Sequence, residues 1–256
     1  VPQHRAGGRT VYWPRGKVLG GSSSINAMIY IRGNRHDFQA WKDEHGCVGW
    51  GYEDLMPYFR RAEDNSRGAS PYHGTGGPLA VTDPRYKSQA CAAFIAAAEE
   101  QGAKANDDFN GPRQDGVGWY QVTQRNGQRC SAATAYLHPA LSRPNLTVLT
   151  DALVTSVIIE GGHATGVRYL HHGEPQTARA NAEVILSGGA VNSPQLLMLS
   201  GIGPAEHLIE MGIDVHADLR GVGGNLSDHP VLPVVWSTPK IRGLWEKAGN
   251  TSQLCW

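Results

Sequence analysis

Residues 15–33 read RGKVLGGSSSINAMIYIRG, and we call this stretch the cradle. Gly20 and Gly21 carry no Cβ, so the backbone there can turn with φ above zero and can approach a ligand closely. The serines and Asn26 that follow supply polar groups for a ligand, and the apolar residues from Ile25 onward can cover its less polar part. A Gly/Ser cluster is also the ordinary composition of a connecting loop. The stretch alone therefore predicts either a ligand cradle or a loop.

A second stretch, residues 189–203, reads GAVNSPQLLMLSGIG and follows a short apolar run over 182–187. Such a run is typical of a strand buried on both faces in a parallel sheet. The pattern predicts a strand, a glycine turn and a helix that begins near Asn192 or Ser193 with Pro194 in its first turn. The helix would direct unpaired N–H groups toward the carboxyl end of the strand, where open α/β sheets bind ligands. An ordinary strand-to-helix turn is the alternative.

The composition is that of a globular protein. The chain has 256 residues, 40% of them hydrophobic, which is enough for one large domain or two small ones. Lys+Arg and Asp+Glu both number 23, so no global charge attracts the chain to nucleic acid, and we expect no nucleic-acid partner. Glycine accounts for 32 of the 256 residues, which is a larger share than the usual value of about 7%. This excess indicates a loop-rich α/β protein.

Cysteine and histidine usage predicts neither a metal site nor a disulfide framework. The four cysteines are far apart and form no CxxC pair, and the eleven histidines show no metal spacing. We expect free thiols in a reducing compartment. The chain starts at Val1 without a signal-peptide pattern, and no apolar run is long enough to cross a bilayer. We therefore expect a piece of a cytoplasmic protein without a transmembrane segment, and leave peripheral association with a membrane open.

Periodicity and turn residues predict the remaining elements. Helices are expected over 35–46, over 52–65, over 88–101 with Ser88 as N-cap and Gly102 beyond its end, and from Ser131 toward Leu141. Strands are expected over 79–82 and 117–123, and in a β-meander over 146–150, 152–160 and 164–170. These elements alternate without any internal repeat.

The two quoted stretches resemble the signatures of a known family. The order Gly-Lys-x-Leu-Gly-Gly-Ser-Ser-x-Ile-Asn over 16–26, continued through Tyr30 and Gly33, is similar to the first signature of the glucose/methanol/choline (GMC) flavoprotein oxidoreductases. Residues 189–203 resemble the second signature, and 221–229, which read GVGGNLSDH, resemble a further family segment. The resemblance covers nearly the whole chain as the central fragment of a longer protein, closest to the choline dehydrogenase-like branch.

The resemblance implies an α/β (α+β mixed) fold that is incomplete at both ends. A GMC-type FAD-binding domain would occupy residues 1–70 and 129–225, and a second, antiparallel-sheet substrate domain would occupy 71–128 and begin further strands over 226–256. The sequence contains no strand followed by GxGxxG with an acidic residue beyond it. We therefore expect the family's ADP-binding βαβ unit to precede Val1.

The resemblance also implies FAD as the cofactor, with its isoalloxazine ring against the cradle. The residues that would contact the flavin side are Gly20, Gly21, Ser22, Asn26, Ala27, Met28 and Ile29, and the backbone of Val154 would meet the adenine part. Some relatives attach FAD through a histidine at the position of Ile25. Because isoleucine stands there in this chain, we expect FAD to be bound non-covalently.

For the intact protein, the resemblance implies oxidation of a small alcohol to an aldehyde, with hydride transfer from the CH–OH group to flavin N5. The family's catalytic histidine segment would lie beyond Trp256, so no catalytic residue and no metal ligand is assigned in this chain. Two alternatives stay open. One is a non-catalytic truncated fragment that binds FAD or another nucleotide, and the other is a flavin-containing lyase of the same family. The alcohol, the electron acceptor and the oligomeric state are left unassigned.

Overall fold

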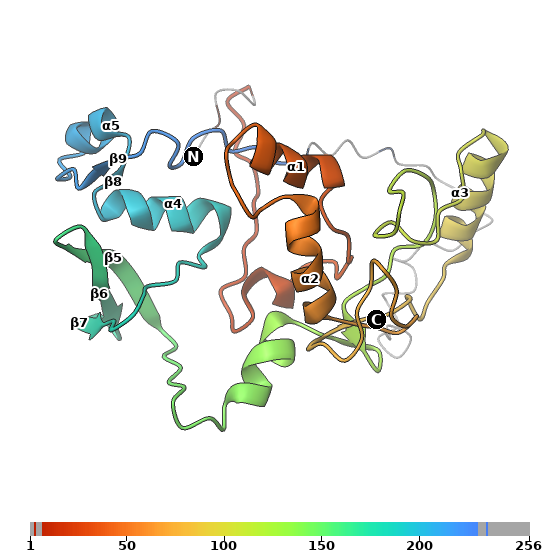
Figure 1. The fold of residues 1–256 in the computed structure, drawn as a ribbon, viewed down its shortest axis with the longest axis horizontal. Helices are drawn as coiled ribbons and strands as arrows, with labels where there is room; N and C mark the ends of the chain where they lie inside the picture. The colour runs from red at the N-terminus through yellow and green to blue at the C-terminus, as the bar shows by residue number, and fades with distance from the viewer. Residues whose placement is uncertain (1–2, 4–6, 230–233, 235–256) are drawn as a thin grey trace. The chain divides into compact units, whose positions relative to one another are not determined.

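The computed structural model describes residues 3, 7–229 and 234 (Figure 1). These residues fall into two compact units, of which the first ends at Leu146 and the second begins at Thr147. The strands predicted within 226–256 fall mostly outside the described residues, and 226–229 form no strand. Among the described residues, no helix is both long enough and apolar enough to cross a membrane.

Two helices of the first unit pack around Phe38. Helix α1 (Arg35–Asp43) begins with a capping box, in which Asn34 Oδ1 accepts from His36 N and Asp37 Oδ2 accepts from Asn34 N. Helix α2 (Tyr52–Ala62) follows it, and Phe38 packs between the two helices. The Phe38 ring lies 5.3 Å from Trp41 and 5.7 Å from Phe59, centroid to centroid. Both helices confirm the prediction, although each ends earlier than expected.

Helix α2 leads into a short parallel pair, β1 (Glu63–Asn65) with β2 (Leu79–Val81). Beyond β2, Thr82 pairs with Val122 and Val122 pairs with Ile29, each as a single antiparallel bridge. The predicted strand over 117–123 is wrong. Val117 bonds Ala105 in a parallel bridge while Val122 bonds two other segments, so no single neighbour continues along this stretch and a regular ladder cannot form.

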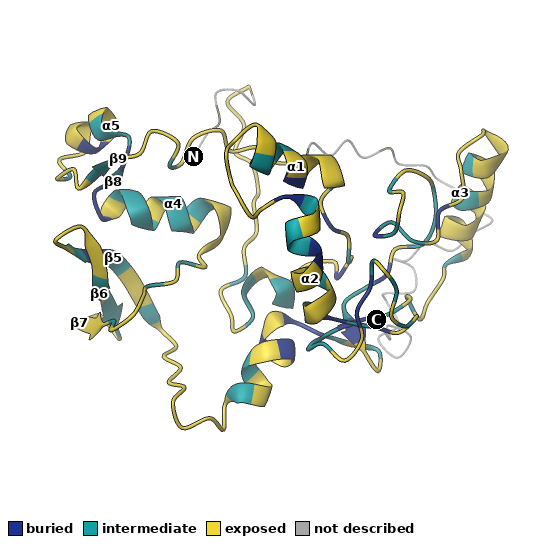
Figure 2. Cartoon of the chain, viewed as in Figure 1, coloured by how far each residue is buried: buried dark blue, intermediate teal, exposed yellow. Residues whose placement is uncertain are grey.

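Helix α3 (Gln89–Glu100) lies where the sequence predicts a helix. Ser88 Oγ accepts from Cys91 N at 3.1 Å, and Gly102 beyond the helix end has φ of +91°, so both predicted caps are confirmed. No residue of α3 is buried by the described part of the chain, as its yellow and teal colouring in Figure 2 shows. Phe94 of this helix is accordingly 70% exposed.

The short hairpin β3 (Gln124–Arg125) with β4 (Gln128–Arg129) precedes two irregular helical turns. The predicted helix from Ser131 is present as the π-helical turn η3 (Ala133–Leu137) and the 3₁₀ turn η4 (His138–Ala140), with Ser131 Oγ accepting from Thr134 N. It is not an α-helix. Pro139 lacks the N–H that an α-helix would bond to Ala135 O, which explains why the α pattern is not maintained.

The second unit contains a three-stranded antiparallel meander in the order β5 (Ala152–Glu160), β6 (His163–His171), β7 (Glu174–Arg179). The predicted meander is therefore confirmed, but its third strand is β7 and not the predicted 146–150. Asp151 has φ of +54°, which interrupts the extended backbone just before β5. Residues 147–150 pair with no strand among the described residues.

Helix α4 (Gly189–Leu199), strand β8 (Ile202–Gly203), helix α5 (Ala205–Glu210) and strand β9 (Ala217–Asp218) complete this unit, and β8 pairs with β9 in parallel. Ser200 Oγ accepts from Val157 N at 2.8 Å and so joins the end of α4 to the meander. Helix α4 begins at Gly189, earlier than the predicted Asn192 or Ser193, and Pro194 lies inside it.

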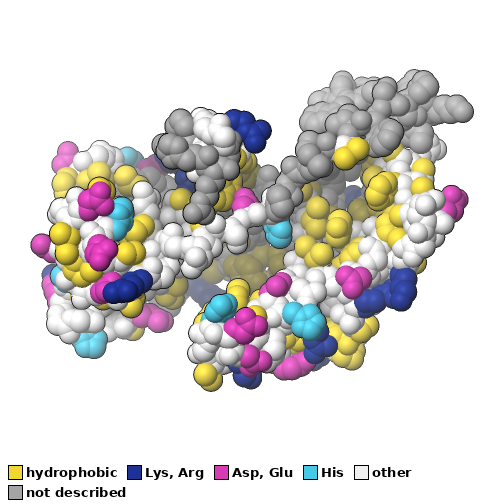
Figure 3. Space-filling view, turned by 90° about the horizontal axis from the view of Figure 1, so that it is seen from above, with side chains coloured by type: hydrophobic (Ala, Val, Ile, Leu, Met, Phe, Trp, Pro, Cys, Tyr) yellow, Lys and Arg dark blue, Asp and Glu magenta, His cyan; other side chains and the backbone are white. Residues whose placement is uncertain are grey.

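The predicted strand over 182–187 is also wrong. Ile185 is 75% exposed and the segment forms no β-pairing within the described part of the chain. A strand exists only by hydrogen bonding to a neighbour, and no described strand pairs with this segment. Figure 3 shows hydrophobic side chains at the surface of both units, in keeping with such uncovered segments.

Candidate functional site

The cradle turns at two glycines in the left-handed region. Gly20 has φ of +89° and Gly21 has φ of +55°, and the 3₁₀ turn η2 (Gly21–Ser24) follows. A Cβ on Gly20 would lie 2.5 Å from Ser24 Oγ, whereas a Cβ on Gly21 would meet nothing within 4 Å. Gly20 is therefore required by the packing of the turn itself. Gly21 leaves bare backbone facing open space, where a ligand can approach.

The serines of the cradle mainly hold this turn together. Ser23 Oγ donates to Gly20 O at 2.5 Å and accepts from Ala132 N at 2.8 Å, and Ser24 Oγ donates to Leu19 O at 2.8 Å. Ser22 Oγ accepts from Gly16 N at 3.2 Å, and no described residue accepts a bond from its hydroxyl. Ser22, one of the predicted contacts, is thus the serine of the cradle whose hydroxyl is left to donate to a ligand.

Asn26 fixes the segment that leaves the turn. Its Oδ1 accepts from Met28 N at 3.0 Å and from Arg129 Nη1 at 2.8 Å, and the same Arg129 nitrogen donates to Ser23 O. The side chain is exposed, and no described residue accepts from its Nδ2. The amide group is therefore free to donate to a ligand. Arg129 lies far away in sequence and carries no motif, so sequence reasoning missed this cation beside the cradle.

Met28 and Ile29 have opposite orientations. Met28 has φ of +61°, and its side chain is buried with Sδ 3.8 Å from Gln124 Nε2, so only its backbone can contact a ligand. Ile29 lies opposite Val122, and the two flanking bonds run from Thr123 N to Met28 O and from Tyr30 N to Gln121 O. In an antiparallel ladder with these bonds, the N–H of Ile29 points away from Val122.

Ile29 therefore forms a free backbone edge. Val122 exchanges both of its backbone bonds with Thr82 on its other side, and no described residue accepts from the Ile29 N–H. The side chains of Ile25 and Ile29 are about half exposed, at 51% and 47%, and Ala27 is exposed between them. A backbone donor beside exposed apolar side chains suits a flat ligand with a polar edge.

Val154 lies in the second unit, on the outer strand β5 opposite Tyr169 of β6. A pocket of about 650 Å³ opens beside it, lined by Val154, by residues 183–188 and by Asn192 and Ser193 of α4. This volume is in the range of small-molecule sites. The structure thus brings Val154 together with the glycine turn of the second signature, where Gly189 has φ of +81°. The seven other predicted contacts lie in the first unit.

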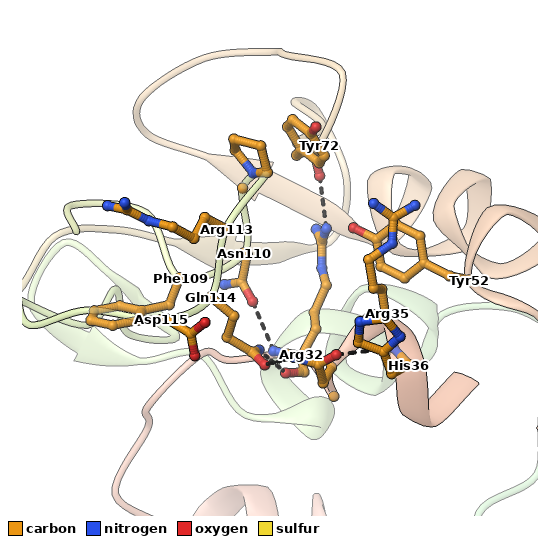
Figure 4. Close-up of a pocket in the computed structure, with 14 residues that line it drawn as sticks. Arg32, Arg35, His36, Tyr52, Tyr72, Phe109, Asn110, Arg113, Gln114 and Asp115 are labelled. Carbon is orange, nitrogen blue, oxygen red and sulfur yellow. Dashed lines mark hydrogen bonds between the residues drawn. The ribbon is translucent and has the colours of Figure 1, made fainter. Parts of the chain in front are cut away.

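A smaller pocket of about 230 Å³ in the first unit lies beside Arg32 (Figure 4). Asn110 Oδ1 accepts from Arg32 N at 2.8 Å, Asn110 Nδ2 donates to Tyr30 O at 3.0 Å, and Gln114 Nε2 donates to Arg32 O at 2.9 Å. The amides of Asn110 and Gln114 thus hold the backbone that follows Ile29. These residues are about 80 positions away from it in sequence, so no local pattern predicts the contact.

The chain is similar to known oxidoreductases over most of its length. The GMC oxidoreductase family model matches residues 4–231. The chain is 50% identical over 222 residues to the mitochondrial choline dehydrogenase of Homo sapiens, covering 87% of this chain and 37% of that protein. It is 49% identical over 232 residues to the alcohol dehydrogenase (acceptor) of Pseudomonas putida, covering 90% and 42%.

Solved structures of other oxidoreductases are also similar to this chain. Pyridoxine 4-oxidase from Mesorbium loti superposes with a TM-score of 0.80 and 37% identity, covering 86% of this chain and 43% of that one. An FAD-dependent oxidoreductase from Chaetomium thermophilum also gives 0.80, with 30% identity and coverage of 86% and 40%. The chain spans about 40% of the length of the curated relatives it matches. The family predicted from the two signatures is confirmed: the chain belongs to the GMC oxidoreductase family.

Proposed function

We propose that this chain is the part of an oxidoreductase that holds FAD non-covalently, and that the intact protein oxidises a small alcohol to an aldehyde. The observation that carries the proposal is a left-handed turn at Gly20-Gly21 that is followed in the cradle by a free backbone edge at Ile29. Membership of the GMC family supports it, as do relatives named for choline and alcohol dehydrogenation. Choline is therefore the first alcohol to test.

The predicted contacts have the chemistry that a flavin requires. The Ile29 N–H, the Asn26 amide and the Ser22 hydroxyl are donors for the carbonyl oxygens and ring nitrogens of the isoalloxazine, and Gly20 and Gly21 allow close backbone approach. Exposed Ala27 and Ile29 cover the apolar part of the ring, and Met28 contributes backbone only. Ile25 has no nucleophilic atom, so it cannot form a covalent bond to the cofactor.

The adenine part of FAD is assigned to the pocket beside Val154 in the second unit. The start of α4 supplies backbone N–H groups and the positive end of its dipole for phosphate groups. When bound, FAD supplies the hydride acceptor of the reaction. We also propose the division predicted above, with residues 71–128 in the substrate domain and 1–70 and 129–225 in the FAD-binding domain.

The test is an absorbance spectrum of the purified protein after incubation with FAD and removal of free FAD on a desalting column. Retained flavin bands are expected, and a colourless protein would contradict FAD binding by this chain. Anaerobic addition of choline or another small alcohol to the intact, flavin-loaded protein should then bleach the flavin. Flavin that is retained but not bleached by any alcohol would favour the lyase or the non-catalytic fragment.

A further inference from the structure

His73 lies between two carboxylates in the interior of the first unit. Its Nδ1 is 2.9 Å from Glu63 Oε1, its Nε2 is 3.0 Å from Asp108 Oδ2, and the residue is 6% exposed. An ionised carboxylate only accepts hydrogen bonds, and a neutral imidazole has a single N–H. Both contacts are hydrogen bonds at once only when both ring nitrogens carry a proton. The two carboxylate contacts therefore favour the imidazolium form of His73.

The neighbouring Asn65 does not change this assignment. Asn65 Nδ2 lies 3.0 Å from His73 Nδ1, but its two hydrogens are taken by Glu63 Oε1 at 2.8 Å and Gln121 Oε1 at 2.9 Å. Asn65 Oδ1 accepts in turn from Gln121 Nε2. The Asn65 amide is thus fully used by these partners, and the proton on His73 Nδ1 is left to Glu63.

The charges around His73 balance. Glu63, the first residue of β1, also accepts from Arg32 Nη2 at 2.9 Å. Asp108 lies two residues before Asn110 in a loop and contacts the other side of the His73 ring. Two cations, Arg32 and His73, thus face two carboxylates. The hydrogen bond to Glu63 is the largest influence on the pKa of His73 and raises it; burial opposes this, and Asp108 adds to the rise.

Both carboxylates are connected by hydrogen bonds to the segment that follows the free edge at Ile29, Asp108 through Asn110 and Glu63 through the side chain of Arg32. Asp108 Oδ1 accepts from Asn110 N at 3.1 Å, and Asn110 holds Arg32 N and Tyr30 O, as Figure 4 shows for its contact with Arg32. Glu63 holds the guanidinium of the same Arg32. His73 contacts both Glu63 and Asp108 and so joins these two sets of hydrogen bonds.

We propose that His73, as an imidazolium, is a positioning residue for the cofactor edge, because it holds together the two carboxylates that anchor residues 30–32 behind Ile29. The inference rests on the proposed FAD function. When His73 loses a proton, either Glu63 or Asp108 loses its hydrogen bond from the imidazole, and the charges of the buried Glu63 and the half-buried Asp108 are left with less compensation. The backbone behind Ile29 then loosens, and FAD is held less tightly.

The experiment measures the dissociation constant of FAD in the intact protein, by flavin fluorescence, from about pH 6 to about pH 9, starting near the usual histidine pKa of about 6.5. Affinity should fall as pH rises through the raised pKa of His73, by at most about tenfold per pH unit. His73→Gln should bind FAD about tenfold more weakly at the acidic end, with no dependence on pH. His163→Gln, at an exposed position on β6, is the matched control and should keep the wild-type profile.

Asp108→Asn gives a rescue that a purely structural role would not produce. Its amide oxygen can still accept from Asn110 N, and its amide nitrogen can donate to a neutral His73 Nε2. FAD affinity should therefore stay high across the whole pH range, and this variant decides the question if His73→Gln does not fold. A wild-type affinity that is the same at every pH would overturn the role of His73 alone. Failure to bind FAD at any pH would overturn the proposed function itself.

Discussion

Arg32 Nη2 lies 2.9 Å from Glu63 Oε2, with both side chains almost completely shielded from solvent, at 4% and 0% exposure. Arg32 also donates to Tyr72 O at 2.8 Å, and its guanidinium lies 5.0 Å from the centre of the Phe59 ring. Removing two charges from water is costly, so such a pair adds little net stability while intact. Breaking it leaves one charge buried without a partner.

We therefore expect Glu63→Gln to destabilise the protein by about 3–5 kcal/mol, because Arg32 then has no counter-charge. Urea unfolding of the intact protein measures the change. The control is Asp64→Asn. Asp64 is the residue after Glu63, and its carboxylate makes an exposed ion pair with Arg125 at 3.5 Å. That variant should cost at most about 1 kcal/mol. Equal losses in the two variants would show that burial of the Arg32–Glu63 pair has no energetic consequence.

Stability should depend on pH on both sides of a window set by Glu63 and His73. Burial alone would raise the pKa of Glu63, but hydrogen bonds from His73, Asn65 and Gly74 outweigh it and lower that pKa below 4.5. The contribution of Glu63 is therefore present above 4.5 and is lost as pH falls through the lowered pKa.

For His73 the sign is opposite. Its pKa is raised above 6.5, so its contribution is complete below 6.5 and is lost as pH rises through the raised pKa. Melting temperatures measured against pH should be highest between these limits, and His73→Gln should abolish the alkaline decline. A decline that persists unchanged in this variant would assign it to another group.

Asn26→Ala should weaken FAD retention in the intact protein. The variant removes the acceptor for Met28 N and for the charged Arg129, and a bond of the second kind is worth about 1.5–3 kcal/mol. The expected loss of affinity is about tenfold to about a hundredfold. Asn145→Ala, at an exposed loop position, is the control and should retain FAD as the wild type does. Unchanged retention in Asn26→Ala would remove the cradle from the FAD site.

Gly20→Ala should be more harmful than Gly161→Ala, although both glycines have positive φ. A Cβ at Gly161 would meet nothing within 4 Å, so that variant pays only for left-handed backbone, about 1–2 kcal/mol. A Cβ at Gly20 would also press on Ser24 Oγ at 2.5 Å and Ala133 Cβ at 3.2 Å. Urea unfolding should therefore show the larger loss for Gly20→Ala, accompanied by weaker FAD binding. Equal losses of stability in the two variants would mean that the cradle turn accommodates the new Cβ at no additional energetic cost.

Leu208→Ala should destabilise the second unit by about 2–5 kcal/mol, because Leu208 is completely buried in α5 and the substitution leaves a cavity. The adjacent Ile209 is 68% exposed, and Ile209→Ala should change stability by about 0.5 kcal/mol or less. Thermal unfolding followed by circular dichroism measures both. A small effect at Leu208 would indicate that the unit can collapse around the missing side chain.

Elements that depend on neighbouring residues could be predicted from the sequence. Ser88 caps α3 and Gly102 follows its end in the left-handed region, both as expected, and Gly161-Gly162 form the turn between the predicted strands β5 and β6. The Gly20-Gly21 turn of the cradle is of the same kind. Each requires only a side chain that bonds its own backbone nearby, or a residue that tolerates positive φ.

Elements that depend on distant partners could not be predicted. The segments 117–123 and 182–187 have strand-like composition, yet neither forms a regular strand, because a ladder requires a neighbour of matching length and direction. Helix α4 begins at Gly189, before the Asn192 or Ser193 that its Ser and Pro residues suggest.

The family and the cradle were therefore readable in the sequence, whereas the surroundings of the cradle were decided by tertiary structure. Arg129 reaches Asn26 from about a hundred residues away, and His73 comes to lie between Glu63 and Asp108 only after three segments have packed together. The physical reason is that local motifs encode backbone turns, while hydrogen bonds and charge pairs between distant segments exist only once those segments share one interior.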